Sequence, residues 1–515
     1  MTSDSLAPEL VEGHIPVGDK GLKAGALGYL SNIVIGVAST APAYSLAATL
    51  GFIVAVKGVG VHAPGVLIAS FVPMLFVALG YRYLNKADPD CGTTFAWTTR
   101  AFGPYLGWIN GWAIFVADVI VMASLAVIAA QYTYLLFGWT SAENSTTWTI
   151  VGAVVWIALM TWICYRGIEL SARTQQGLLA AEILILAAFA VVALVKVYQG
   201  NALPGSLHVS AAWFNPFSIS FSALADGVLL GIFIYWGWDS GVAVNEESEA
   251  SAEGPGRAAV VSTLLLVAIY VVVSTAAQAF GGTRLLEQNS NDVLSVLGTH
   301  AFGSPWDKLL IIAVLTSASA STQTTILPTA RTTLSMARWG AIPKIFGEIH
   351  PRYLTPTVST LGMGALSIVW TVLLVALNPA QDVLGDSITG LGFAICFYYG
   401  FTGLACAVYY RHELLASARN LVLVGVLPML GCVLMFAVFG KALVDYSKPD
   451  AGYAPPLFGI QVPIVIGIGA LLVGVPLAGV CAVRYRTYFL RRPQAAPSGS
   501  LEHEAASGPL NPASI

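Results

Sequence analysis

The sequence predicts an all-α polytopic membrane protein with about 12 transmembrane helices. Two properties of the 515 residues support this prediction. The chain is 56% hydrophobic and only 10% charged, with a mean hydropathy of +0.75, whereas soluble proteins carry about 25% charged residues because their surface faces water. Apolar stretches of about 20 residues, long enough to cross ~30 Å of hydrocarbon as a helix, recur along the chain. Helices are expected because lipid offers backbone groups no hydrogen-bond partner.

These stretches define an N-terminal tail of residues 1–22, a membrane domain of residues 23–486 and a C-terminal tail of residues 487–515. The C-terminal tail is rich in Pro, Ala, Ser and Gly, so we expect it to be disordered. The polar N-terminus lacks a basic segment followed by an apolar core, so no cleavable signal peptide is expected. The expected spans are residues 26–56, 64–84, 105–137, 147–165, 174–198, 221–245, 258–280, 305–330, 356–378, 386–410, 420–440 and 460–484.

Positively charged residues predict an orientation. With a cytoplasmic N-terminus, 18 of the 24 Lys and Arg residues fall on the inner side and six on the outer side. Cytoplasmic loops carry an excess of Lys and Arg. The chain is therefore expected to be a multi-pass protein of the cell membrane with both termini in the cytoplasm.

Several other classes of protein lack support in the sequence. The net charge of −3 does not indicate nucleic-acid binding. The six cysteines show no CxxC spacing, so we expect apolar packing rather than disulfides, a metal site or a cofactor. The histidines fall in tails, loops or span ends, and His412-Glu413 lacks the second histidine of a zincin because position 416 is Ala416. We do not expect an enzyme.

Two spans contain interruptions. The first runs from Gly36 to Ala43 through Pro42, and proline removes a helical hydrogen bond. The sixth runs Trp236-Gly237-Trp238 and then Asp239. Paired breaks of this kind indicate a five-plus-five inverted repeat, although two ordinary kinks are the alternative.

Three segments resemble the amino acid–polyamine–organocation (APC) superfamily, in particular its amino acid permeases. They are residues 89–112, which contain Arg-Ala-Phe-Gly-Pro, residues 331–356, and Gly237-Trp238-Asp239. The resemblance implies a LeuT-like fold with broken helices 1 and 6. Repeat one would span about 26–198, repeat two about 221–411, and two C-terminal helices about 420–486.

The chain departs from the family pattern at two places. The first span has Ala38-Ser39-Thr40-Ala41-Pro42 where a Gly-Ser-Gly-Ile type run is commoner, which leaves the substrate class open. In some members the run resembled by Ser171-Ala172-Arg173 leads to a lysine in place of a sodium ion. Here that position is Glu182, so no fixed positive charge is expected there.

Three acids stand out well inside the predicted spans: Asp118, Glu182 and Asp239. An acid at mid-membrane costs ~2.5–3.5 kcal/mol on insertion scales and is usually functional. No Lys or Arg lies at similar depth, so each acid is either protonated or near a bound cation. We predict that Glu182 carries a transported proton, with sodium as the alternative ion. The structural alternatives are a helix-linking hydrogen bond for Glu182, a helix cap for Asp239 and a packing role near Asn110 for Asp118.

The predicted substrate site lies at the two breaks. Backbone amides in the span-one break face the positive end of a half-helix, which suits a carboxylate. Carbonyls freed in span six suit an ammonium, and aromatic faces attract cations; packing is the alternative role of these aromatics. The predicted substrate-binding residues are Ser39, Thr40, Ala41, Pro42, Phe233, Ile234, Trp236, Gly237 and Trp238.

Hydroxyl residues in span eight are predicted to serve helix packing, with sodium coordination as the alternative. They are Thr316, Ser317, Ser319, Ser321 and Thr322. Gly107-x-x-x-Gly111 is likewise expected to be a packing motif.

The sequence thus predicts a secondary active transporter that moves amino acids by alternating access, coupled to protons. A transporter or exchanger of polyamines or other organic amines is the runner-up, followed by a nutrient sensor with a transporter fold and by a membrane enzyme. The sequence leaves open which amino acid or amine is moved, symport or exchange, and the oligomeric state.

Overall fold

The structure is a computed structural model, and it describes residues 20–290, 292–377, 380–449, 451, 454–496 and 501. Twelve segments of this part of the chain are long and apolar enough to cross a membrane, in agreement with the predicted number. The rest of the described chain is short helices and loops, with β-structure limited to isolated bridges. The tail residues 1–19 and 502–515 lie outside the described residues.

The spans are formed by long helices, two of them in two pieces. The spanning helices are α1 (Tyr29–Ser39) with α2 (Pro42–Ala55), α3 (Ala63–Ala87), α5 (Pro104–Phe137), α7 (Thr146–Arg166), α8 (Ile168–Tyr198), α9 (Phe221–Tyr235) with α10 (Ser240–Ala243), α11 (Gly254–Gln288), α13 (Leu309–Arg338), α14 (Thr357–Leu377), α15 (Ala380–Tyr409), α17 (Leu427–Tyr446) and α19 (Ala470–Arg484). The short helices are α4 (Thr94–Phe102), α6 (Thr140–Glu143), α12 (Val293–Phe302), α16 (Ala418–Asn420), α18 (Val462–Ile464) and α20 (Arg486–Phe489).

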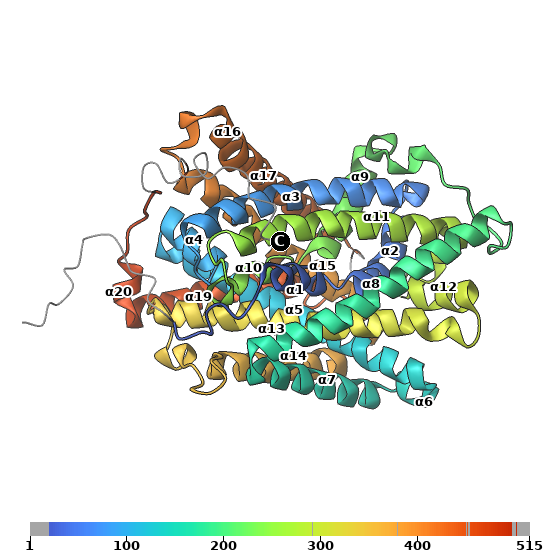
Figure 1. Ribbon diagram of the computed structural model, residues 1–515, viewed down its shortest axis with the longest axis horizontal. Coiled ribbons are helices and arrows are strands. Elements are labelled where there is room, and N and C mark those ends of the chain that lie inside the picture. The colour runs from blue at the N-terminus through green and yellow to red at the C-terminus, as the bar shows by residue number, and fades with distance from the viewer. Residues whose placement is uncertain are drawn as a thin grey trace, which may run out of the picture.

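Burial separates central from peripheral spans. In the apolar windows of spans one and three, 89% and 94% of the residues are buried, against 33% in spans four and five and 28% in span twelve. Figure 1 shows α3, α11 and α13 running along the long axis of the molecule, with α8 crossing obliquely. The exposed side chains of the peripheral helices are mostly apolar, as expected for surfaces that face lipid. Spans one and three are therefore the most deeply buried spans in the described part of the chain.

The parts of both predicted tails that lie next to the membrane domain pack against it. Residues 487–496, which the sequence assigns to the disordered tail, instead continue through α20 and pack on the domain. Tyr488 is fully buried, with its hydroxyl 2.9 Å from the Thr99 hydroxyl and donating to the Pro104 carbonyl at 3.1 Å. Lys20, at the end of the predicted N-terminal tail, is also buried. Aromatic and charged side chains thus attach both tails to the same end of the bundle.

Candidate functional site

The chain leaves helical geometry between α1 and α2. Ala41 has a left-handed backbone (φ 48°, ψ 66°), and Pro42 opens α2 without an N–H of its own. The amides of Thr40 and Ala41 donate to the carbonyls of Val37 and Ala38 at 3.2 and 3.1 Å. From the sequence, we expect these amides to be free for a carboxylate. The structure differs because the end of α1 tightens into i→i−3 bonds that use both of them.

The first amides of α2 point instead to a protein carboxylate. The Ala43 amide donates to Oε1 of Glu182 at 2.7 Å, and the Ser317 hydroxyl donates to the same oxygen at 2.8 Å. The Tyr44 amide in turn donates to the Ser317 hydroxyl at 3.2 Å. Glu182 is completely buried, and its Oε2 has no hydrogen-bond partner among the described residues.

The position of Glu182 follows from the sequence of α8. Glu182, Leu186, Phe189 and Ala193 recur at helical spacing and are buried, while Leu184 on another face is 71% exposed. The carboxyl is therefore held on the inner face of a peripheral helix, directly against the break in span one. An ionised carboxylate at a helix N-terminus is stabilised by ~0.3–1 kcal/mol, and by up to ~2 kcal/mol when buried.

The break in span six meets the break in span one. Gly237 has φ 117°, and a Cβ at this position would lie 2.9 Å from the Ser39 carbonyl oxygen. Only glycine fits both the backbone angle and this approach. The Ser39 and Ser240 hydroxyls are 2.8 Å apart, and the Ser321 hydroxyl donates to the Ser39 carbonyl at 2.8 Å. Two segments about 200 residues apart in the chain therefore touch through small residues.

Asp239 lies at the N-cap position of α10, but its side chain makes no capping hydrogen bond. Three phenol groups donate to it instead. Tyr399 donates to Oδ1 at 2.8 Å, while Tyr398 and Tyr81 donate to Oδ2 at 3.3 and 3.4 Å. The Asp239 side chain therefore does not cap α10. Tyrosines of α3 and α15 hold its carboxyl group instead.

Aromatic rings surround this carboxyl. Trp238 packs edge-on against Tyr81 and stacked on Tyr399, with ring centroids 4.9 and 5.2 Å apart, and its indole N–H has no partner among the described residues. The indole N–H of Trp236 donates to the Tyr398 hydroxyl. The Ile234 carbonyl accepts from the Tyr270 hydroxyl at 2.7 Å. The Phe233 ring packs edge-on against the Tyr44 ring, with their centroids 6.5 Å apart.

Asp118 belongs to a different contact. The hydroxyl of Thr329 in α13 donates to it, whereas Asn110 donates to Thr94 at 2.6 Å. The sequence suggests a packing role for Asp118 near Asn110, but the two side chains have different hydrogen-bond partners. Asp118 links α5 to α13.

The span-eight hydroxyls divide into two groups. Thr316, Ser319 and Thr322 donate to carbonyls of their own helix, while Ser317 and Ser321 donate to Glu182 and to span one. All five thus have hydrogen-bond acceptors within the protein.

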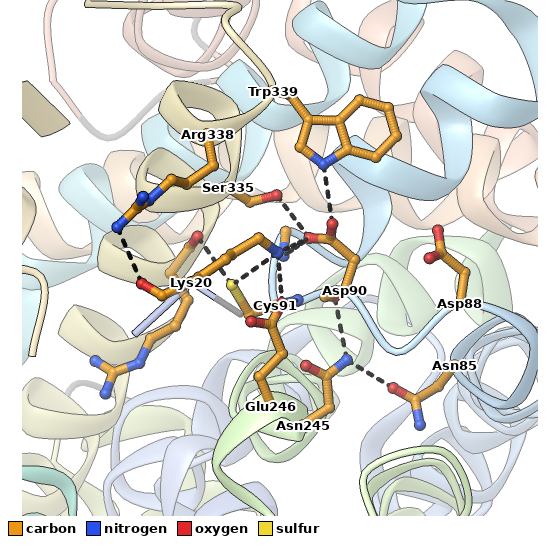
Figure 2. A network of polar contacts seen from close by, with 12 residues as sticks. Lys20, Asn85, Asp88, Asp90, Cys91, Asn245, Glu246, Ser335, Arg338 and Trp339 are labelled. Carbon is orange, nitrogen blue, oxygen red and sulfur yellow. Dashed lines mark hydrogen bonds and ion pairs between the residues drawn. The ribbon is translucent and has the colours of Figure 1, made fainter. Parts of the chain in front are cut away.

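A second polar cluster, the Lys20 network, was missed at the sequence level (Figure 2). The Lys20 ammonium lies 2.9 Å from Asp90 Oδ1, pairs with Glu246 and donates to the Cys91 sulfur at 3.7 Å. Two side chains at the end of span eight donate to Asp90: the Ser335 hydroxyl at 2.6 Å and the Trp339 indole N–H at 2.9 Å. This cluster lies at the end of the bundle predicted to be cytoplasmic and links the segments flanking spans one, two, six and eight.

Lys20 supplies the positive charge for two carboxylates in this network, Asp90 and Glu246. Burial opposes ionisation of Asp90, but Lys20 and the hydrogen bonds of Ser335 and Gly92 bring its pKa to about 2. Burial likewise lowers the pKa of Lys20, but the negative groups around it, Asp90 first and then others such as Glu246, together more than reverse that effect and raise it. Asp90, Cys91 and Glu246 are spaced to hold a metal ion, yet the Lys20 ammonium already lies among them. We conclude that they form an ion-pair cluster.

A fully buried ion pair lies beside this network. The Arg331 guanidinium donates twice to Glu247, at 2.9 Å each, and both side chains are 0% exposed. The sequence signal for it is weak, because acids such as Asp90, Glu246 and Glu247 are common in loops. Arg331 gives no hint from the sequence either, because it falls just past residue 330, where span eight is expected to end.

Comparisons with known proteins identify relatives over most of the chain. A family model described as "Amino acid permease" matches residues 27–466. The human Asc-type amino acid transporter 1 is 26% identical over 448 residues, covering 83% of this chain and 78% of that protein. The branched-chain amino acid permease BcaP of Bacillus subtilis is 23% identical over 64% of this chain and 71% of its own. The arginine/ornithine antiporter of Latilactobacillus sakei is 22% identical over 72% and 77%.

Proposed function

This chain belongs to the amino acid permease family of the APC superfamily, and we propose that it is a proton-coupled permease working by alternating access in the cell membrane. It is an amino acid transporter by this membership. The proton, the mechanism and the cytoplasmic placement of both termini are the proposal. The observation that carries the proposal is the position of Glu182 against the break in span one.

Glu182 can couple a proton to movement of span one. As a carboxylate it accepts from the first amide of α2 and from Ser317 of span eight. Protonation of Glu182 removes the negative charge that the start of α2 stabilises. The proton can bind at Oε2, the oxygen without a partner among the described residues, which then becomes a hydroxyl donor. The half-helix α2 is thereby released from α8. One proton thus changes how strongly span one is held to its surroundings.

The breaks in spans one and six are consistent with the five-plus-five inverted repeat that the sequence predicts. In this arrangement spans one and six move against spans three, four, eight and nine. The 2.8 Å contact between Ser39 and Ser240 joins the two moving spans. We infer that this contact opens when substrate enters between them.

An amino acid has a carboxylate and an ammonium, and the two breaks offer groups for both. The Ser39 and Ser240 hydroxyls can each donate to a carboxylate. Asp239, with Trp238 and Trp236 beside it, can hold the ammonium, since buried carboxylates and aromatic faces both attract cations. An amine without a carboxylate would bind only to Asp239 and its neighbouring tryptophans. This cluster therefore also supports the alternative of an amine substrate.

Competition uptake in proteoliposomes tests the substrate class. A panel of neutral, acidic and cationic amino acids is added with the amine obtained by decarboxylating each one, under an inward proton gradient. We expect an α-amino acid to compete and its amine to compete at least about tenfold more weakly, because the amine loses a charged carboxylate contact. If the amines compete and the amino acids do not, the substrate is an amine without a carboxylate.

The Lys20 network is proposed to close the cytoplasmic side of this pathway. It ties the segment before span one and Glu246 after span six to Asp90 and the end of span eight. These are the elements that separate when the site opens inward. The carbonyl of Lys20 also accepts from Arg338 at 3.1 Å, which fixes the tail segment on span eight.

We expect Lys20→Met to increase cytoplasmic opening. Without the ammonium, the buried Asp90 and the half-buried Glu246 lose their counter-charge, which favours hydration of the cluster. The readout is labelling of Cys91, which is fully buried, by an impermeant maleimide in inside-out vesicles, with the other five cysteines replaced by serine. We expect labelling at least about tenfold faster, which corresponds to ~1.4 kcal/mol of lost closure.

The control for this experiment is Lys344→Met, an exposed lysine at the same predicted end of the bundle. It should leave the labelling rate unchanged. Loss of the Lys20 charge by itself disfavours the reactive thiolate, so faster labelling reports exposure rather than reactivity. Unchanged labelling in Lys20→Met would remove this cluster from the gate.

A further inference from the structure

A basic cavity lies at the corner between spans four and five, and it shares no lining residue with either cluster described above. Its volume is about 310 Å³. The cations Arg166, Arg173, Arg352 and Lys23 line it with a single acid, Glu169. Four cations and one acid make the lining net +3. Four segments meet there: the segment before α1, the end of α7, the start of α8 and the loop that follows α13.

The cavity's positive charge is mostly uncompensated. Lys23 and Glu169 pair with each other at 2.7 Å. No carboxylate among the described residues forms an ion pair with Arg166, Arg173 or Arg352. A single residue, Gly167, separates α7 from α8, and no side chain caps the first turn of α8. The positive end of this 31-residue helix therefore adds to the field of the arginines.

One guanidinium is already oriented. The Arg166 guanidinium carbon lies 5.2 Å from the centres of both the Trp162 and Tyr353 rings. Stacking restricts the planar group and leaves its N–H fork available. Arginine forks bind phosphate through paired N–H···O bonds. The group that this lining best suits is a phosphate monoanion or diester.

The cavity is continuous with a surface that faces lipid. Val155, Leu159 and Trp162 are 59%, 42% and 49% exposed, and they lie at helical spacing on the face of α7 that ends at Arg166. Leu170, which lines the cavity, is 41% exposed. An acyl chain lying along this stripe would place its headgroup at the arginines. Tryptophan at such a position is typical of the membrane interface.

We propose that this cavity binds the phosphate headgroup of an anionic phospholipid, with the acyl chains against the exposed stripe of α7. Basic pockets between transmembrane helices suit such headgroups. A zwitterionic lipid adds an ammonium that the net +3 lining repels. The inference stands independently of the transported substrate and of the ion that drives transport.

Native mass spectrometry of the detergent-solubilised protein tests this site. The protein is titrated with phosphatidylglycerol, with phosphatidylcholine of the same chains, and with inorganic phosphate as competitor. We expect phosphatidylglycerol to bind at least about tenfold more tightly than phosphatidylcholine. The triple variant Arg166→Gln, Arg173→Gln, Arg352→Gln should bind phosphatidylglycerol at least about tenfold more weakly.

The charge-matched control is Arg484→Gln, Arg486→Gln, Arg492→Gln, which removes three exposed arginines from the same predicted end. It should change binding less than about twofold. The single variant Arg173→Gln, which disturbs no stacked ring, is measured as well in case the triple variant misfolds. Equal losses in both triple variants, or no preference for phosphatidylglycerol, would overturn the proposal. Displacement of the lipid by millimolar inorganic phosphate would overturn the lipid source and leave a site for soluble phosphate.

Discussion

Replacing Glu182 by glutamine is expected to abolish proton-driven accumulation of substrate while leaving substrate exchange intact. Glutamine has nearly the same shape and keeps an acceptor for the Ala43 amide and the Ser317 hydroxyl. It can neither bind nor release a proton. The measurement is uptake into proteoliposomes with and without an inward proton gradient, beside counterflow of labelled substrate. We expect accumulation to fall to the level set by exchange alone.

Two further variants sharpen this test. Glu182→Asp keeps the titratable group but shortens the reach to α2, so partial accumulation should return. Glu348→Gln, which changes an exposed acid at a loop, should accumulate substrate like the unmodified protein. Undiminished accumulation in Glu182→Gln would remove Glu182 from the coupling mechanism, and loss of counterflow together with accumulation would point to a structural role.

Breaking the Arg331–Glu247 pair is expected to have the largest effect on stability. Both side chains are fully buried and joined by two hydrogen bonds of 2.9 Å. Glu247→Ala leaves the guanidinium as a buried charge without a partner, which typically costs about 3–5 kcal/mol. Chemical unfolding of the protein in detergent micelles measures this loss. Replacing both residues, Arg331→Met with Glu247→Leu, should restore most of it because neither charge remains.

An exposed ion pair provides the comparison. Arg257 and Glu253 lie one turn apart, 2.7 Å from each other and 38% and 44% exposed. Glu253→Ala should cost no more than about 1 kcal/mol, since water solvates the two cations that Glu253 pairs with, Arg257 and Lys86. If Glu247→Ala were equally mild, or if the double replacement were as unstable as the single one, the buried pair would not contribute as proposed.

The positions of the spans and the family were within reach of the sequence. Apolar runs such as residues 105–137 and 174–198 correspond to α5 and α8, because a lipid-exposed backbone must satisfy its own hydrogen bonds. The resemblance carried by residues 89–112 and 331–356 is confirmed by the family match. Family membership also confirms the expectation of a transporter rather than an enzyme. The inverted repeat and the orientation remain predictions.

The partners of the acids were not within reach. Hydropathy indicates that Asp118, Glu182 and Asp239 are buried, but not what they contact. Glu182 meets an amide 139 residues away, and Asp239 meets tyrosines about 160 residues away. The substrate-binding assignments of the two breaks remain predictions for the same reason.

The sequence by itself determined which segments are long and apolar enough to cross the membrane, because this property depends on neighbouring residues in one stretch of chain. Only the tertiary structure decided that Glu182 occupies the start of α2. It also placed Lys20 among Asp90, Cys91 and Glu246. Such pairings depend on the packing of distant helices, and a charge's need for a partner does not specify which partner it will find.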